Sequence, residues 1–518
     1  MTPNDRSSSR VPNILVGIGF LLLAMAYAAL VWSSELTELG GDSAGYLLMA
    51  RYYSPYHVAS SAVLDYKMQI ITPPLFPWLL AAVDGGYNLL AAHLIVAFFA
   101  VAATTALYLW LRKELLPIWL SAVIALIFAL MPSTLLQVFN IWTEFPFIFF
   151  SLAAIALLAR AEASSSSRIW FWGAVLVACA SLTRVASLPF LAAFLLFLLY
   201  KRPRHFLLFG LTAILPFAIW ASYSGHSETG AGAYVSHIFD VYSSNPVQRL
   251  MLQLRRESGA ILVAWQSAWL GTSFSDILPK IIWGFGLICV GGWLYRLKSL
   301  RFDAIYVLLY LALLFVWPHP EEAMRYSFVL YPILIANGFL LLSAVFQCVP
   351  GLGSQVLMAG VMAATLIISM LPTLIYNAGR FFDATPDELA FAKHRAEWYS
   401  ESRTQAIANA SFQLRLFRHL DEVDRIVPAR DCIFAIKPTV ITLIADRASF
   451  VPPKISDDDK HFGMGIKKCR FAYVLPFASP SFGLPLYPMA RLGDKAKILT
   501  KIDDERGQME GGLIEITP

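Results

Sequence analysis

Residues suited to catalysis are concentrated in one polar stretch of the chain, from Gly40 to Trp78. It begins with Gly40-Gly41-Asp42-Ser43-Ala44-Gly45-Tyr46 and ends with Thr72-Pro73-Pro74-Leu75-Phe76-Pro77-Trp78. A long apolar run precedes Asp42, so we expect its side chain to lie just outside one face of a membrane. A carboxylate in that position is well placed for chemistry on substrates that a lipid carries.

The composition places this stretch in a polytopic membrane protein. Hydrophobic residues make up 58% of the 518-residue chain and charged residues only 14%, whereas roughly 25% of residues are charged in soluble domains. The formal net charge of +5 is small for this length, and the basic residues flank apolar runs instead of forming a nucleic-acid groove. We therefore expect membrane lipids as partners, and no nucleic acid.

Apolar runs predict about eleven transmembrane helices. The first, Val11 to Trp32, is too long for a typical signal peptide, so we expect it to be retained. The predicted architecture is an α-helical membrane module of residues 1–376, with outer loops at 33–86 and 224–278, and a tail of residues 377–518. The other runs cover residues 87–111, 117–135, 140–160, 169–183, 185–200, 205–223, 279–297, 303–318, 325–347 and 353–376.

Loop charges predict the orientation of these helices. If Arg10 is cytoplasmic, every second short loop is basic, as the positive-inside bias requires of cytoplasmic turns. The N-terminus is then cytoplasmic and the tail extracytoplasmic. The basic loops carry Arg112, Lys113, Arg160, Arg168, Lys201, Arg202, Arg204, Arg296, Lys298 and Arg301.

The same orientation gathers ionisable residues at the outer helix ends. Asp42, Glu144, Arg184 and the segment from Glu321 to Arg325 all fall there. A charge at the centre of a membrane helix costs roughly 2.5–3.5 kcal/mol on insertion scales, so charges that persist usually face a cavity or one another. These residues are therefore the candidates for a functional site.

Each candidate also has a purely structural interpretation. Asp42 can cap a loop or short helix, and Thr143-Glu144-Phe145-Pro146 is typical of a helix start. Arg184 can be a snorkelling anchor. Arg325 can pair with Glu321 or Glu322. Tyr46 and Tyr331, two further candidates, can be interfacial aromatic residues.

The outer loop 224–278 contains a predicted amphipathic helix, from Asn245 to Arg256, that is basic on one side. It can close over a site, or it can be a simple packing helix at the membrane interface.

The tail predicts a small α/β domain. Residues 383–424 have a helical pattern, and three short apolar runs follow that resemble strands: Cys432 to Ile436, Val440 to Ile444 and Phe471 to Leu475. Cys432 and Cys469 each stand at the start of such a run. Whether they form a disulfide stays open, because spacing alone does not show proximity.

The motifs together resemble those of GT-C glycosyltransferases, in the group that uses polyprenyl-phosphate sugars and includes protein mannosyltransferases and lipid A aminoarabinose transferases. The Asp42 segment and the Pro73-Pro74 segment resemble the first outer loop of that group. Later landmarks follow in the same order: Thr143-Glu144-Phe145-Pro146, Leu182-Thr183-Arg184, Glu322-Ala323-Met324-Arg325-Tyr326 and Tyr331-Pro332.

This resemblance implies transfer of a sugar, with inversion, from a polyprenyl phosphate to a lipid, polysaccharide or protein acceptor. A phosphate leaves without protonation, so the site needs one base, Asp42, and cations for the phosphate. The implied substrate-binding residues are Tyr46, Lys67, Glu144, Arg184, Arg325 and Tyr331.

One departure concerns the donor site. The aminoarabinose transferases have a lysine directly before the proline of the second half-motif, where this chain has Thr72 and its nearest lysine is Lys67. The first loop has no Asp-x-Asp motif or histidine cluster. We therefore expect no strictly required cofactor, with a divalent metal left open.

Two other classes of protein share a polytopic composition. A transporter or flippase should have repeated halves and binding groups near the midplane of the membrane, but no internal repeat is visible and the charges lie at helix ends. A receptor that senses through its tail would leave the Asp42 loop without a purpose.

Overall fold

The computed structural model describes residues 10–37, 42–67, 72–161, 166–224, 241–243, 245–271, 277–347, 355–383, 389–453, 459–475, 492–503 and 509–517. The chain forms two compact units. Unit 1 contains residues Met1–Trp32, Ile71–Phe76 and His93–Asp383, and unit 2 contains Ser33–Ile70, Pro77–Ala92 and Ala384–Pro518. Most of the first polar stretch therefore packs with the tail. The division into a catalytic module and a tail at residue 376 stays a prediction.

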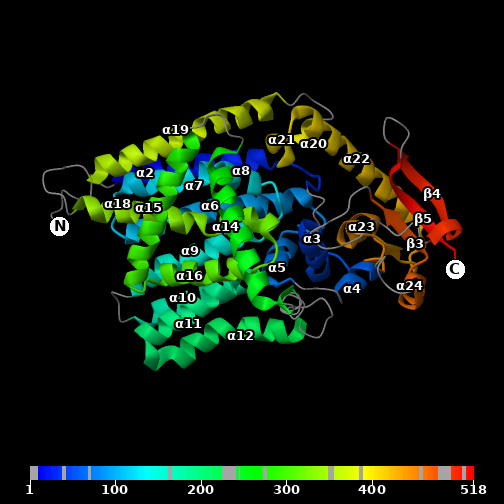
Figure 1. Cartoon of the computed structure of the whole chain (residues 1–518), viewed down its shortest axis with the longest axis horizontal. Helices are drawn as coiled ribbons and strands as arrows, with labels where there is room; N and C mark the ends of the chain where they lie inside the picture. Colours follow the sequence, from blue (N-terminus) through cyan, green and yellow to red (C-terminus); the bar gives the residue numbers. More distant parts are fainter. Residues whose placement is uncertain are drawn as a thin grey trace. The chain divides into compact units, whose positions relative to one another are not determined.

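Unit 1 is a bundle of apolar helices (Figure 1). Each of the eleven predicted apolar runs contains a helix, because a helix satisfies its backbone groups internally in an apolar environment. The helices are α2 (Arg10–Leu30), α6 (Leu89–Lys113), α7 (Ile118–Leu130), α8 (Pro132–Gln137), α9 (Glu144–Ala161), α10 (Ser167–Ser181), α11 (Leu188–Lys201), α12 (Phe206–Ser224), α14 (Pro246–Leu270), α15 (Leu278–Lys298), α16 (Phe302–Val316), α17 (Ala323–Phe328), α18 (Tyr331–Gln347) and α19 (Gln355–Phe382).

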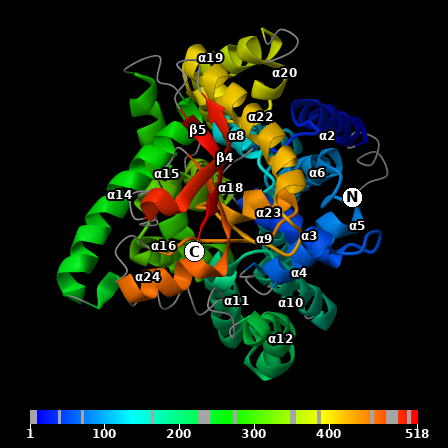
Figure 2. The same cartoon turned by 90° about the vertical axis from the view of Figure 1, so that its right-hand side faces the viewer.

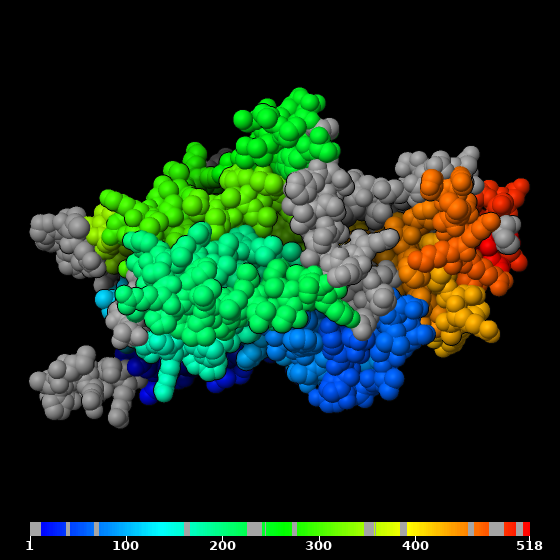
Figure 3. All heavy atoms as spheres, turned by 90° about the horizontal axis from the view of Figure 1, so that it is seen from below, coloured from blue at the N-terminus to red at the C-terminus, as the bar shows by residue number. Residues whose placement is uncertain are grey.

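Five helices in the described part are long and apolar enough to cross a membrane, and a bent pair raises this number to six. Five shorter apolar helices of 10–17 residues accompany them. Their outward side chains are apolar: on α12, Leu207 is 73% exposed and Ile219 60%. In Figure 3, α12 forms part of the visible surface of unit 1. Such a surface fits a lipid environment.

The predicted run 325–347 is not one straight helix. α17 and α18 meet at a bend of 61°. Pro332 stands at the start of α18, where its missing N–H and its ring prevent the preceding helix from continuing through it. The bend places Arg325 on a short separate helix.

The helix of the outer loop extends well beyond its predicted end at Arg256. α14 continues to Leu270, where Gly271 adopts a positive φ of 55°. Its later turns bury Trp265 and Trp269, which pack in unit 1 against Phe285. Arg255 and Arg256 are exposed, as the predicted basic side requires.

Unit 2 combines one long helix, α22, and several short helices with a five-stranded mixed sheet in the order β2-β1-β3-β5-β4 (Figure 2). β1 pairs in parallel with β2 and β3, whereas β5 pairs antiparallel with β3 and β4. The elements are α3 (Asp42–Tyr53), α4 (Ser61–Lys67), α5 (Leu75–Ala82, of which 77–82 belong here), α20 (Leu389–Ala392), α21 (Glu397–Ser400), α22 (Arg403–Ile426), β1 (Ile433–Phe434), α23 (Pro438–Ala445), β2 (Ser449–Phe450), α24 (Asp459–Gly465), β3 (Phe471–Val474), β4 (Ala496–Asp503) and β5 (Met509–Ile516).

The small α/β domain is present, but one predicted strand is wrong. The run from Val440 to Ile444 lies in helix α23, with Pro438 at its start. A short continuous apolar run fits a buried helix as well as a strand, and proline in the first turn favours the helix. The other two runs contain β1 and β3.

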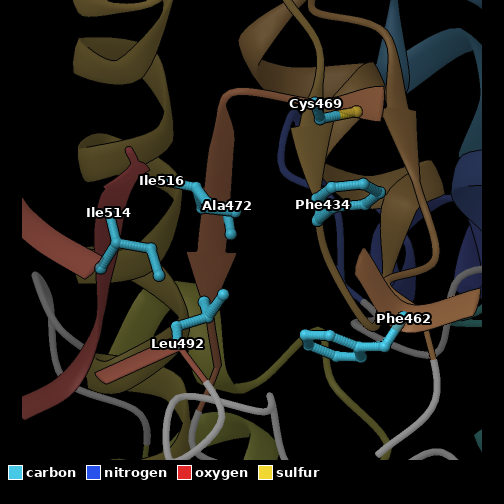
Figure 4. Close-up of a cluster of buried hydrophobic side chains, with 7 residues drawn as sticks. All are labelled: Phe434, Phe462, Cys469, Ala472, Leu492, Ile514 and Ile516. Carbon is cyan, nitrogen blue, oxygen red and sulfur yellow. The ribbon is translucent and has the colours of Figure 1, made fainter. Parts of the chain in front are cut away.

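A hydrophobic cluster and a disulfide stabilise the sheet region. Figure 4 shows the cluster, which includes Phe434 on β1, Phe462 on α24 and Ile514 on β5. Cys432 and Cys469 are bonded to each other, with their Cα atoms 4.9 Å apart. This answers the question that spacing left open. The bond ties the start of β1 to the start of β3.

Candidate functional site

One buried carboxylate in unit 1 binds two arginines. Oε1 of Glu144 lies 3.0 Å from Nη1 of Arg184 and 2.7 Å from Nε of Arg325. The three residues come from three motifs that are far apart in the sequence. Glu144 is only 1% exposed and Arg184 only 6%, so the ion pairs are largely shielded from water. We call these three residues the ion cluster.

Each member of the ion cluster lies at a helix end. Glu144 is the first residue of α9, where a negative charge is favoured by the helix dipole. Arg184 has an extended backbone between α10 and the short 3-10 turn of residues Val185–Ser187. Arg325 lies in α17, whose separation from α18 leaves the guanidinium near the start of α9.

Aromatic rings surround the two guanidinium groups. Cζ of Arg325 lies 4.1 Å from the centroid of the Trp142 ring, and Cζ of Arg184 lies 5.5 Å from that of Tyr326. Tyr310 donates a hydrogen bond of 3.1 Å to the carbonyl oxygen of Tyr326. Cation–π contacts of this kind hold an arginine side chain in one orientation. None of these aromatic residues was predicted as part of a site.

The Pro73-Pro74 segment joins the same end of unit 1. The backbone N–H of Leu75 donates a hydrogen bond of 2.9 Å to the carbonyl oxygen of Leu182, two residues before Arg184. Thr72 is half-buried, and Pro73 and Pro74 are buried. Four of the motifs singled out in the sequence therefore converge in unit 1.

Tyr331 lies close to this region but is enclosed. It is 2% exposed, and its hydroxyl lies 2.8 Å from the hydroxyl of Ser327. Its ring packs edge-on against Trp265.

A second charged cluster lies at the opposite helix ends of unit 1. Arg296 donates two hydrogen bonds of 2.7 Å to the carboxylate of Asp303 and one of 2.9 Å to Glu114. These three residues and Leu158 line a small cavity. Leu158 follows Glu144 along α9 by fourteen residues, or about 21 Å of helix. The sequence predicts this end to be cytoplasmic. The ion pairs of Arg296 connect α15 to Asp303 on α16 and to Glu114.

Asp42 belongs to unit 2. It is the first residue of α3 and its side chain is exposed, whereas Tyr46, one turn later, is 7% exposed. Exposure leaves the carboxylate accessible to a substrate. Lys67 is the last residue of α4, and its side chain falls outside the described part of the structure.

Arg51 fixes α3 within unit 2. Its Nε donates to the carbonyl oxygen of Gly86 at 2.9 Å, and its Nη1 donates to that of Leu443 at 2.8 Å. A Cβ on Gly86 would stand 2.7 Å from the backbone nitrogen of Arg51, so the loop can approach α3 this closely only with glycine. Arg51 thus joins α3, which begins with Asp42, to the turn at Gly86 and to helix α23.

Two buried polar residues of α14, Gln253 and Glu257, were not predicted from the sequence as candidates for a site. Gln253 donates hydrogen bonds to Glu257 at 3.0 Å and to the carbonyl oxygen of Trp317 at 2.5 Å. Burial, together with the nearby Glu321, raises the pKa of Glu257 to about 7. The available signal was an i,i+4 polar pair on the face of the helix that carries Trp265.

Metal ligands are not grouped in the described part of the chain. Among those residues, no set of three or more His, Cys, Asp or Glu side chains could hold a metal ion. Single carboxylates such as Asp42 can still take part in binding a hydrated Mg²⁺ together with substrate phosphates.

Solved structures to which the chain is similar include three membrane glycosyltransferases. The Archaeoglobus fulgidus oligosaccharyltransferase, in a complex with Zn and sulfate, aligns over 88% of this chain and 67% of its own, with a TM-score of 0.48 and 13% identity. The Cupriavidus metallidurans ArnT bound to undecaprenyl phosphate aligns over 96% and 97%, with a TM-score of 0.46 and 11% identity.

The third is the S. cerevisiae protein O-mannosyltransferase Pmt1-Pmt2 complex bound to the sugar donor. It aligns over 42% of this chain and 33% of its own, with a TM-score of 0.31 and 17% identity. All three are GT-C glycosyltransferases, the superfamily that the sequence motifs resemble. Because all three TM-scores are below 0.5, the functional assignment rests on this chain's own residues.

No protein-family model matches the chain, and no curated protein matches its sequence.

Proposed function

We propose that the chain is a GT-C-type glycosyltransferase that moves a sugar from a polyprenyl phosphate to an extracytoplasmic acceptor. The observation that carries this proposal is the convergence of four motifs in unit 1. Leu75 and Arg184 come together through Leu182, and Glu144 joins Arg184 to Arg325. Charges that are buried among apolar helices are costly and usually functional.

The ion cluster supplies phosphate-binding groups. Arginine presents a rigid fork of donors that matches phosphate oxygens, and Glu144 holds two such forks next to each other. Arg325 is the more accessible of the two, with 14% of its side chain exposed against 6% for Arg184. Arg325 is therefore assigned to the donor phosphate, and Glu144 and Arg184 position it.

Asp42 is assigned as the general base. It removes the proton from the acceptor hydroxyl or amine while that atom forms a bond to the anomeric carbon. The bond from the anomeric carbon to the phosphate oxygen breaks, and polyprenyl phosphate leaves as an anion. A single displacement inverts the anomeric configuration. Tyr46, Lys67 and Tyr331, which the resemblance also implies, are proposed as further substrate-binding residues.

The proposed topology has eleven spans, a cytoplasmic N-terminus and an extracytoplasmic tail in a bacterial inner membrane. The disulfide between Cys432 and Cys469 supports it, because disulfides persist in oxidising compartments. The basic turns at the Arg296 end support a cytoplasmic location for that side of unit 1.

The test is transfer of radiolabelled sugar from a panel of polyprenyl-phosphate donors in membranes that contain the protein. Wild type should consume at least one donor, and Asp42→Asn should abolish the transfer. The matched control is Asp65→Asn, which changes an exposed carboxylate of α4 in the same loop and should retain activity.

The same assay separates the alternatives. If no donor is consumed, or if Asp42→Asn equals wild type, the assignment of Asp42 fails and a transporter or flippase becomes the better interpretation. The chelator EDTA should leave transfer intact, and its abolition by EDTA would contradict the proposed independence from metal.

A further inference from the structure

A basic pocket in unit 2 shares no residue with the site proposed above. This cavity of about 780 Å³ is bordered by α24, the 3-10 turn that follows it, the start of β3 and the end of β5. Its volume falls within the roughly 300–1,000 Å³ of typical small-molecule sites. All the lining residues belong to the tail.

Positive charge dominates the lining of the basic pocket. Among the described lining residues, four are cationic and one, Glu515, carries a carboxylate. Arg470 is engaged with this carboxylate, because its Nε donates to Oε1 at 2.8 Å. Lysine ammonium groups act as compact point charges for phosphate. The three lysines are exposed and have no ion pair with any described residue: Lys460, Lys467 and Lys495.

Apolar side chains line another part of the same cavity. Leu492, Cys469 and Ile516 belong both to the lining and to the buried cluster of Figure 4. An apolar surface beside cations suits a ligand with a carbon ring next to a charged group. The hydroxyl of Thr517 and the carboxylate of Glu515 add partners for hydroxyl groups.

The frame of the basic pocket is held together by backbone bonds. Ile516 donates to the carbonyl oxygen of Arg470 at 2.8 Å, and Thr517 donates to that of Lys495 at 2.8 Å. The disulfide fixes Cys469 from the other side. A preformed frame lowers the ordering cost of binding.

We propose that the basic pocket binds a phosphate-bearing saccharide, with the phosphate between the lysines and the sugar ring against Leu492 and Ile516. The size of the cavity exceeds what inorganic phosphate needs, and its two-sided lining matches an anion joined to a polar ring with apolar faces. This inference stands independently of the transferase activity, since binding is measured without turnover.

The test uses the purified full chain in detergent and calorimetric titration with glucose 1-phosphate, glucose and inorganic phosphate. Glucose 1-phosphate should bind, and added salt should weaken it. The double variant Lys467→Gln/Lys495→Gln should weaken it by about tenfold or more, as expected for the loss of two charge-assisted contacts. The control Lys497→Gln, an exposed lysine of β4 outside the pocket, should bind like wild type.

Several results would overturn the proposal. These are no binding of glucose 1-phosphate to wild type, equal binding to the double variant, or equal affinity for inorganic phosphate, which would make the pocket a free-phosphate site. Displacement of glucose 1-phosphate from wild type by short-chain phosphatidylglycerol, with loss of phosphatidylglycerol binding in the double variant, would identify a lipid headgroup instead. Thermal unfolding of each variant checks that the fold is intact.

Discussion

At the scale of single residues, Glu144 has the largest structural role in the ion cluster. One of its oxygens serves both Arg184 and Arg325, while the other, Oε2, is buried without a hydrogen-bond partner among the described residues. The two ion pairs fix the position of the Glu144 carboxylate, and they also fix the guanidinium groups of Arg184 and Arg325. The cluster behaves as one unit.

Glu144→Gln should destabilise unit 1 strongly. The amide cannot balance the two arginines, and removing one member of a buried ion pair costs about 3–5 kcal/mol. The midpoint of thermal unfolding in detergent should fall by several degrees, whereas Asp383→Asn, at an exposed carboxylate after α19, should leave it unchanged. Equal midpoints for wild type and Glu144→Gln would contradict a structural role for the cluster.

Glu257 makes stability depend on pH. Its folded pKa of about 7 lies above the usual 4.5, so the folded state holds the proton more tightly than the unfolded state. Its contribution is therefore full below about pH 4.5 and is lost as pH rises through about 7. Glu257→Gln keeps a neutral group at all pH values, so the unfolding midpoint should fall less between about pH 5 and 8 than in wild type. Parallel curves for the two proteins would exclude this role.

At the scale of secondary-structure elements, apolar runs predicted the helices well and short runs did not. A run of about twenty apolar residues allows few structures other than a helix, so α2, α6 and α19 follow from composition alone. The run in α23 has five residues, four of them apolar, and such a short run fits a strand or a helix until the sheet around it is known. The extent of α14 depends on tertiary contacts of Trp265 and Trp269 that a sequence pattern does not show.

Close packing of α15 against α18 requires a glycine at position 292. A Cβ on Gly292 would stand 2.1 Å from the carbonyl oxygen of Asn337 and 2.9 Å from the nitrogen of Gly338. Gly292→Ala should therefore force the helices apart and cost about 1–3 kcal/mol or more. Gly284→Ala on the same helix meets nothing within 4 Å and is the matched control.

The measurement is the thermal midpoint and folded yield of both glycine variants in detergent. We expect a clear loss for Gly292→Ala alone. An unchanged midpoint for Gly292→Ala, or an equal loss for Gly284→Ala, would contradict the role of the close contact, because helix propensity by itself favours alanine over glycine.

At the scale of the whole molecule, the sequence predicted which charged residues of unit 1 lie close together. Loop charges placed Glu144, Arg184 and Arg325 on one face, and the structure joins them in one cluster. The sequence did not predict that most of the Asp42 stretch packs with the tail, or that Cys432 and Cys469 meet. Both depend on pairings between distant segments, which hydrophobic periodicity does not encode.

The disulfide should make a large contribution to the stability of unit 2. It closes a segment with a sequence separation of 37 residues, for which loop entropy predicts about 3–4 kcal/mol. Dithiothreitol should lower the unfolding midpoint and increase proteolysis within the tail. The variant Cys432→Ser/Cys469→Ser should show the same loss and no further effect of reductant. An unchanged wild-type midpoint in reductant would contradict this contribution.

Donor binding and donor turnover can be measured separately in the purified protein, and Asp42→Asn should affect only turnover. The measurement is the release of polyprenyl phosphate from a consumed donor, together with the affinity for that donor, in wild type and Asp42→Asn. A transferase with Asp42 as its base predicts that the variant binds the donor as tightly as wild type and releases no polyprenyl phosphate. Release at the wild-type rate, or loss of donor binding together with turnover, would contradict that assignment.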